Sequence, residues 1–198
     1  MKIYHISIER KQNNSTFLLC SASDLYSFNL LQRGTVKEFL RFTSQVIISR
    51  TLSEQRIRIK EQDKYFCHSY VRGDDLGGIL ITDIEYPQRV AFTLLTKVMD
   101  DFTNRYPATK WRTTPGTIDE FSKNLADYIK QYQKPEEADS LMKLQRELDE
   151  TKIILHNTVE NLLERGQKMD DLVAKSDALS ATSKQFYTTA RKTNSCCG

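Results

Sequence analysis

A hydrophobic repeat in the C-terminal third of the chain limits its structure more than any other feature. Alternating steps of three and four residues visit Leu141, Leu144, Leu148, Thr151, Leu155, Thr158, Leu162, Arg165, Met169, Leu172, Ser176, Leu179, Ser183, Phe186, Ala190 and Thr193. Ten of these positions are apolar, five carry small hydroxyl side chains and one is arginine. This alternation is typical of a coiled-coil seam, and it predicts a helix that packs on partner helices because its apolar stripe cannot be buried alone.

The width of the apolar face bears on the number of partner helices. Ile154, Val159 and Val173 fall beside the seam, where a two-stranded coiled coil usually has charged residues. Small seam residues also leave room for close neighbours. The pattern therefore favours a bundle of about four helices, with an ordinary coiled-coil dimer as the alternative.

Arg165 is the one charged residue on the seam, between Leu162 and Met169. A guanidinium buried without partners costs several kcal/mol, and its five N–H donors need acceptors. Partner helices would supply these acceptors at that level, or Arg165 would extend to a hydrated edge of the bundle. Spacing alone leaves both alternatives open.

The N-terminal two thirds combine short strands with helices. Alternating or apolar runs predict strands at 2–10, 15–22, 56–60, 65–72 and 78–82, and helical spacing predicts helices at 35–50, from Pro87 through Phe102, and around 118–132. In the first strand, Tyr4, Ile6 and Ile8 are predicted on one face and Ile3 on the other. The fold class is therefore α+β, with a five-stranded antiparallel sheet and three helices. The expected organisation is a domain at 1–133, a linker at 134–140, the heptad helix at 141–193 and a tail at 194–198.

Phe42 has a distinct position on the first predicted helix. The inward stripe of that helix centres on Phe39, Leu40, Thr43 and Ile47. Phe42 lies about 120° from the centre of this stripe, because successive helical residues turn by ~100°. We therefore expect it on the flank, partly exposed.

Several functional classes find no support in the sequence. The chain has neither a G-x-x-x-x-G-K-[ST] phosphate loop nor a G-x-G-x-x-G motif, and His5, His68 and His156 lack metal-ligand spacing. Cys20 and Cys67 are expected to be reduced thiols in a core. No apolar run approaches the roughly 18–20 residues of a membrane-spanning helix, and the formal net charge of +3 does not indicate nucleic-acid binding. We predict a non-enzymatic protein without cofactor or metal.

Two segments resemble a known family. ELDETKIILHNTVENLLERGQKMDDLVAKSDAL resembles the SNARE motif of the arginine, or synaptobrevin-like, class, and EYPQRVAF at 85–92 resembles part of the longin domain, which has a profilin-like fold. The resemblance implies that Arg165 faces three glutamines from partner SNARE proteins in a four-helix bundle that drives vesicle fusion. It also implies SNARE chaperones or tethering complexes as further partners. A coiled-coil tether that holds membranes together without fusing them remains the alternative.

The C-terminal cysteine pair predicts a lipid anchor. Adjacent cysteines in a polar tail are good lipid acceptors, and the resemblance is to the lipid-anchored longin SNAREs without a transmembrane segment. It implies a prenyl group on Cys197 and a reversible palmitoyl group on Cys196. The family pattern has two more residues after Gly198, so we expect the natural motif to continue.

The resemblance further predicts a closed state and a location. The longin domain would fold back over the seam and the prenyl chain, and Phe42 matches an aromatic residue of the family's docking surface. The expected location is the cytosol and the cytosolic face of Golgi, ER–Golgi vesicle, vacuolar or endosomal and autophagosomal membranes.

Overall fold

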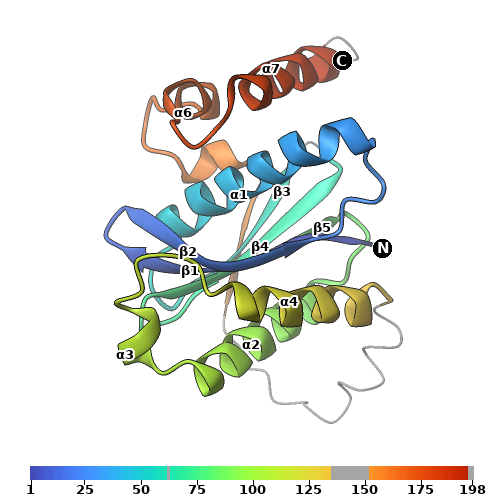
Figure 1. Ribbon diagram of the computed structural model, residues 1–198. Helices are drawn as coiled ribbons and strands as arrows, with labels where there is room; N and C mark the ends of the chain where they lie inside the picture. Colours follow the sequence, from blue (N-terminus) through green and yellow to red (C-terminus); the bar gives the residue numbers. More distant parts are fainter. Residues whose placement is uncertain (62, 135–151, 196–198) are drawn as a thin grey trace.

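A six-stranded sheet forms the centre of the protein. The computed structural model describes residues 1–61, 63–134 and 152–195 (Figure 1). The strands are β1 (Ile3–Gln12), β2 (Ser15–Ser23), β3 (Arg56–Glu61), β4 (Tyr65–Val71), β5 (Leu76–Asp83) and β6 (Ile153–His156), in the spatial order β2-β1-β5-β4-β3-β6. The first five pair antiparallel, as predicted, whereas β6 comes from the heptad region and runs parallel to β3.

Helices cover both faces of this sheet. The three predicted helices are present as α1 (Arg33–Arg50), α2 (Gln88–Arg105) and α4 (Asp119–Tyr132), with short elements at η1 (Leu30–Gln32) and α3 (Ala108–Trp111). One face packs against α2 and α4, and the other packs against α1 (Figure 1). The C-terminal elements η2 (Val159–Leu162), α6 (Met169–Lys175) and α7 (Ala181–Ser195) lie on the α1 side.

The two faces of the sheet have separate apolar clusters. The cluster under α2 and α4 includes Ile6, Leu80, Leu95, Trp111 and Phe121. The cluster on the α1 side combines α1 and strand residues with side chains of the C-terminal region. The second cluster is therefore completed by buried side chains of the heptad segment, whereas the buried residues of the first all come from the N-terminal domain and only the half-buried Ile153 of the heptad segment packs against them. Cys20 and Cys67 are buried free thiols, one in each cluster, as predicted.

A bulge near the start of β1 corrects one prediction. The pairing of β1 with β5 is irregular between Ile3 and His5, which shifts the alternation of side chains by one residue. Ile3 therefore packs with Ile6 and Ile8 in the α2 cluster. Tyr4 instead makes edge-on contacts with Phe28 and Tyr65 on the α1 side.

Burial shifts the pKa values of two polar side chains of β1 toward their uncharged forms. Burial, followed by the charges of Arg41 and Lys37, lowers the pKa of His5 to about 3. Burial raises the pKa of Glu9 to about 7, against smaller opposing effects of Thr16 and of Ser7, whose hydroxyl donates to Oε1 of Glu9 at 3.2 Å. The Nδ1 of His5 lies 2.8 Å from the Ser23 hydroxyl, so this neutral ring is tied to β2.

The heptad region is divided into several elements over the described residues 152–195. A strand, a 3-10 turn and two helices replace one continuous helix in this conformation. The reason is tertiary: the apolar stripe of this segment packs on the sheet edge and α1, whose surface does not offer the straight groove of a helix bundle. The predicted span at 141–151 and the linker at 135–140 lie outside the described residues.

Gly77 allows α1 to approach β5 closely, and this approach can be tested. A Cβ at Gly77 would lie 2.5 Å from Cγ2 of the buried Ile48. We expect Gly77→Ala to lower the free energy of unfolding by about 1–3 kcal/mol, the usual cost of overpacking a core, measured by urea denaturation. Gly34→Ala is the matched control because nothing lies within 4 Å of its Cβ position. Equal stability of the two variants would contradict the close packing of α1.

Candidate functional site

The heptad region begins its contact with the N-terminal domain as an added strand. In the parallel pairing of β6 with β3, Ile153 lies opposite Arg56 and His156 opposite Ile59. The backbone N–H of Val159 then donates to the Glu61 carboxylate at 3.2 Å. The added strand pairs a backbone edge of β3 that otherwise would be exposed.

Phe42 takes part in the apolar contact between α1 and the C-terminal region. Its side chain is 8 % exposed, in one cluster with Val159, Met169, Val173 and Leu179 from the C-terminal region. The expected partial exposure of Phe42 is therefore wrong for this conformation, because the heptad segment covers the flank of α1. We call Phe42 and the cluster members on α1 and β3–β5 the docking surface.

Arg50, at the end of α1, makes a short polar contact with the C-terminal region. Its Nη1 lies 2.6 Å from Oε1 of Glu164, and its Nη2 donates to the Gln167 side chain at 3.1 Å. Glu164 is 69 % exposed, so solvent screens this pair. The contact therefore fixes the orientation of the turn at 163–168 and adds little to the stability of the closed conformation.

Glu38 makes a second polar contact, at the start of α7. The hydroxyl of Ser183, which is fully buried, donates to Oε2 of Glu38 at 2.7 Å, and the backbone N–H of Ser180 donates to the same oxygen at 3.1 Å. The hydrogen bond from Ser183, then those from Ser180, lower the pKa of Glu38. A charged carboxylate on α1 therefore holds the first turn of α7.

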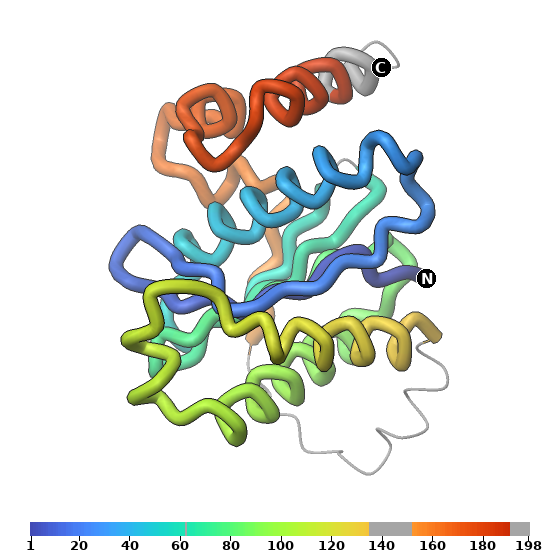
Figure 2. The backbone as a smooth tube through the Cα atoms, viewed as in Figure 1, coloured from blue at the N-terminus to red at the C-terminus, as the bar shows by residue number. Residues whose placement is uncertain are grey.

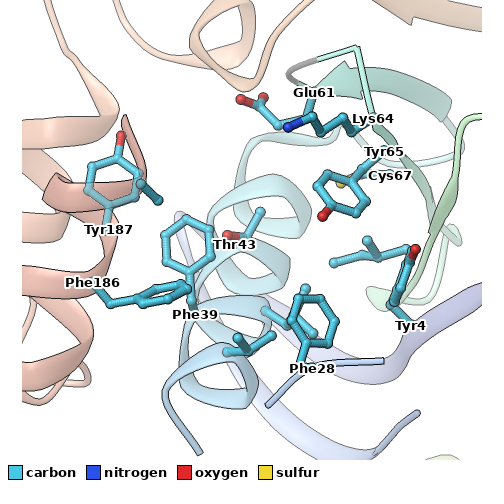
Figure 3. Close-up of a pocket in the computed structure, with 14 residues that line it drawn as sticks. Tyr4, Phe28, Phe39, Thr43, Glu61, Lys64, Tyr65, Cys67, Phe186 and Tyr187 are labelled. Atoms are coloured by element: carbon cyan, nitrogen blue, oxygen red, sulfur yellow. The ribbon is translucent and has the colours of Figure 1, made fainter. Parts of the chain in front are cut away.

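Aromatic contacts and a cavity lie between α1 and α7. The rings of Phe39 and Tyr187 are stacked with centroids 5.2 Å apart. Next to them is a mostly apolar cavity of about 250 Å³, with Phe39, Phe186 and Tyr187 on one side and Phe28, Tyr4 and Tyr65 on the other (Figure 3). Its remaining lining residues are Val36, Leu40, Thr43, Glu61, Lys64, Cys67, Ile81 and Ala190. The mostly apolar lining of this cavity suits an apolar group.

The seam positions are split between the docking surface and solvent. Met169, Leu179 and Ser183 are buried, and the half-buried positions are Leu162, Leu172, Ser176, Phe186 and Ala190. Leu155, Thr158 and Arg165 are exposed, with Leu155 at 60 %. Leu141, Leu144, Leu148, Thr151, Cys196 and Cys197 lie outside the described residues, as does the side chain of Thr193. Val159 and Val173, beside the seam, are buried.

Sequence reasoning did not identify several residues of this site. Arg50 and Glu38 contact partners more than 110 residues away, and no local motif marks such pairs. The strand β6 had a weak signal, since Ile153 and Ile154 form a β-branched pair that suits a strand. The heptad period competed with this signal and predicted a helix.

Neither metal sites nor membrane-spanning helices occur in the part of the chain that the structure describes. No group of three or more His, Cys, Asp or Glu side chains could hold a metal ion there. Among the same residues, no helix combines the length and hydrophobicity needed to cross a bilayer.

Comparison with known proteins gives a match to one family in each part of the chain. The longin family, described as a regulated-SNARE-like domain, matches residues 19–137, and the synaptobrevin family matches residues 140–196. The chain is 48 % identical over 198 residues to "Synaptobrevin homolog YKT6" of Eremothecium gossypii. It is 46 % identical over 198 residues to the protein of the same name from Yarrowia lipolytica, and 46 % identical over 197 residues to that of Schizosaccharomyces pombe. Each alignment covers 100 % of this chain and 98 % of the relative.

Replacing Phe42 tests the docking surface. Phe42→Glu removes the ring and places a charge in the apolar cluster. The lost apolar burial alone, about 2 kcal/mol, should raise the ratio of open to closed molecules about 30-fold. Hydrogen exchange of the amides at 153–190 should accelerate, and the radius of gyration measured by X-ray scattering should increase.

The matched control is Leu52→Glu, which adds the same charge at a side chain that is 62 % exposed. It should leave the exchange rates and the radius of gyration unchanged. The docking surface is refuted if Phe42→Glu remains folded and as compact as the wild type.

Proposed function

This chain belongs to the longin-domain, synaptobrevin-like family of SNARE proteins and is an R-SNARE of vesicle fusion, and we propose that Arg165 forms the central polar layer of its fusion complex. It assembles with other SNARE proteins through the synaptobrevin-like segment at 140–196. We propose that these partners contribute three helices, each with a glutamine at the level of Arg165. The observation that carries this proposal is the single arginine on an otherwise uncharged seam.

The chemistry of Arg165 supports glutamine as its partner. In the closed conformation the Arg165 side chain is exposed and keeps its hydration. Zippering would transfer it between the layers of Leu162 and Met169, where five N–H donors need acceptors. Neutral amide oxygens supply them without a second desolvated charge, and the polar layer fixes the register of the helices.

The closed conformation supports autoinhibition by the N-terminal domain. Met169 and Leu179 are seam positions, yet they are buried against the docking surface, and the seam residue Ser183 is buried beside Glu38. The same side chains cannot pack on the docking surface and in a helix bundle at once. Undocking therefore precedes assembly, and zippering from Leu141 toward Thr193 then pulls the C-terminal end toward the opposing membrane.

A lipidated C-terminus explains how a helix bundle could act on a membrane. Cys197 would carry a prenyl group and Cys196 a palmitoyl group, since two lipids give stable anchoring and one gives only marginal binding. The apolar cavity beside α7 would receive the prenyl chain in the closed form. Ala190, on the last described turns of α7, lines this cavity close to the cysteines in sequence.

The proposed cellular setting follows the family. The closed form would reside in the cytosol and the lipidated form on the cytosolic face of Golgi, ER–Golgi vesicle, vacuolar, endosomal and autophagosomal membranes. SNARE chaperones and tethering complexes would be its further partners. The synaptobrevin family match favours fusion over the alternative of a non-fusogenic tether. Arg165 supports the same choice, because a tether has no need for an arginine in its seam.

The role of Arg165 is tested in reconstituted vesicles with glutamine-bearing partner SNAREs. Every version of this chain in the experiment carries Phe42→Glu, so that the closed conformation does not limit assembly. Arg165→Ala leaves the partner amides unpaired, and we expect the bundle to lose about 2 kcal/mol of stability, with slower lipid mixing. Thermal melting of the complex and fluorescence dequenching measure the two effects.

Lys168→Ala is the matched control, because Lys168 is exposed and lies off the seam. It should leave both readings unchanged. If Arg165→Ala assembles and fuses like this control, Arg165 has no central role, and the tether becomes the better explanation.

The lipid anchor makes a separate prediction. In cells, Cys196→Ser leaves a single lipid, so the membrane-bound fraction should fall markedly, while Cys197→Ser should leave the protein almost entirely in the soluble fraction. Fractionation followed by immunoblotting measures both. A membrane-bound fraction of Cys196→Ser equal to that of the wild type would rule out palmitoylation of Cys196 as the control of membrane binding.

A further inference from the structure

The loop between β2 and α1 exposes three large apolar side chains. Tyr26 is 82 % exposed, Leu30 is 73 % exposed and Leu31 is 89 % exposed. None of them takes part in the docking surface or the cavity. Apolar side chains gathered on one protruding loop indicate an interaction site, whereas scattered ones do not.

The backbone of this loop has a defined shape. The Arg33 guanidinium donates to the carbonyl oxygens of Phe28 and Tyr26 at 3.2 and 3.3 Å. The Asn29 side chain caps the 3-10 turn by accepting from the N–H of Leu31 at 3.2 Å. The apolar side chains are therefore held outward by a structured loop, which reduces the entropy lost on binding.

Positive charge lies directly beside the loop. Arg33 and Lys37 line an open depression of about 310 Å³ together with Ser23, Leu25, Tyr26 and Gly34, without a carboxylate among the lining residues. Arg41 follows at the same four-residue spacing, so the three cations share one side of α1. The nearby Asp24 is engaged by Gln133 and Lys2, at 2.8 and 3.9 Å.

The loop lies at the end of the molecule toward which α7 runs. Ser183 contacts Glu38, whereas Ala190, two turns later, lines the cavity with Val36 and Phe28. Because its later residues meet earlier residues of α1, α7 is antiparallel to α1, as the coloured part of α7 in Figure 2 shows. The exposed loop and the last described turns of α7 therefore lie toward the same end of the molecule (Figure 1).

We propose that the loop at 24–32, together with Arg33 and Lys37, is a direct membrane-contact surface. Tyr26, Leu30 and Leu31 enter the interfacial region of the bilayer, and the two cations bind the phosphates of anionic lipid headgroups. A protruding apolar loop flanked by cations suits a lipid interface, which adapts to any convex shape, better than a protein partner, which needs a matching groove. The contact itself does not require the lipid anchor, although its orientation beside that anchor rests on the proposed function.

Binding of the unlipidated full chain to vesicles tests this surface without any partner SNARE. Co-sedimentation compares vesicles of phosphatidylcholine with vesicles that also contain phosphatidylserine. We expect preferential, salt-sensitive binding to the anionic vesicles. Leu30→Ser/Leu31→Ser should weaken binding to them at least about ten-fold, and Lys37→Gln should weaken it about five-fold.

Leu52→Ser is the matched control, because Leu52 is 62 % exposed just beyond the opposite end of α1. It should bind like the wild type. All substituted side chains are exposed, so unchanged melting temperatures are expected and show that each variant is folded.

Three results would overturn the proposal. The first is absence of wild-type binding to anionic vesicles, and the second is equal binding of the wild type and the double serine variant. The third is wild-type self-association without vesicles that Leu30→Ser/Leu31→Ser abolishes, because the loop would then be a contact between copies. Since no fusion partner is present, none of these results bears on the role of Arg165.

Discussion

The closed arrangement depends on the burial of Val159, Met169, Val173 and Leu179 against Phe42 and the sheet. A segment with so many apolar side chains needs a cover, and in a single chain only the N-terminal domain can supply one. The other contacts follow from this one. N-terminal to these apolar residues, β6 pairs with the edge of the sheet. Near their C-terminal end, Glu38 accepts hydrogen bonds from the residues at the start of α7.

Closure and assembly compete for the same side chains, which makes the chain a two-state device. Met169 and Leu179 are buried in the closed form and lie on the seam that partner helices would cover. Partners shift the equilibrium only by the difference between their affinities for the open and closed forms. Arg165 stays exposed in the closed form. The free-energy cost of removing its hydration therefore arises only during assembly, when partner helices supply hydrogen-bond acceptors.

Much of the fold could be predicted because local patterns specify it. Hydrophobic periodicity and turn residues predict the strands β1 to β5 and the helices α1, α2 and α4, with bounds that differ by only a few residues from those observed. The faces of Ile3 and Tyr4 were predicted wrongly, because a bulge shifts the alternation without leaving a mark in the sequence. Phe42 was expected at the edge of the core, since helical geometry describes one helix and not what lies over it.

The sequence by itself determined the amphipathic stripe at 141–193, the place of Arg165 on it and the composition of an α+β domain, because these depend on residue order alone. Only the tertiary structure decided how that stripe is covered. Within a helix bundle the heptad pattern favours one long helix. Packed on the edge of β3 and on α1, the described part of the same segment forms a strand and shorter helices. The physical reason is that backbone hydrogen bonds can be satisfied in either form, so the surface available for apolar burial selects between them.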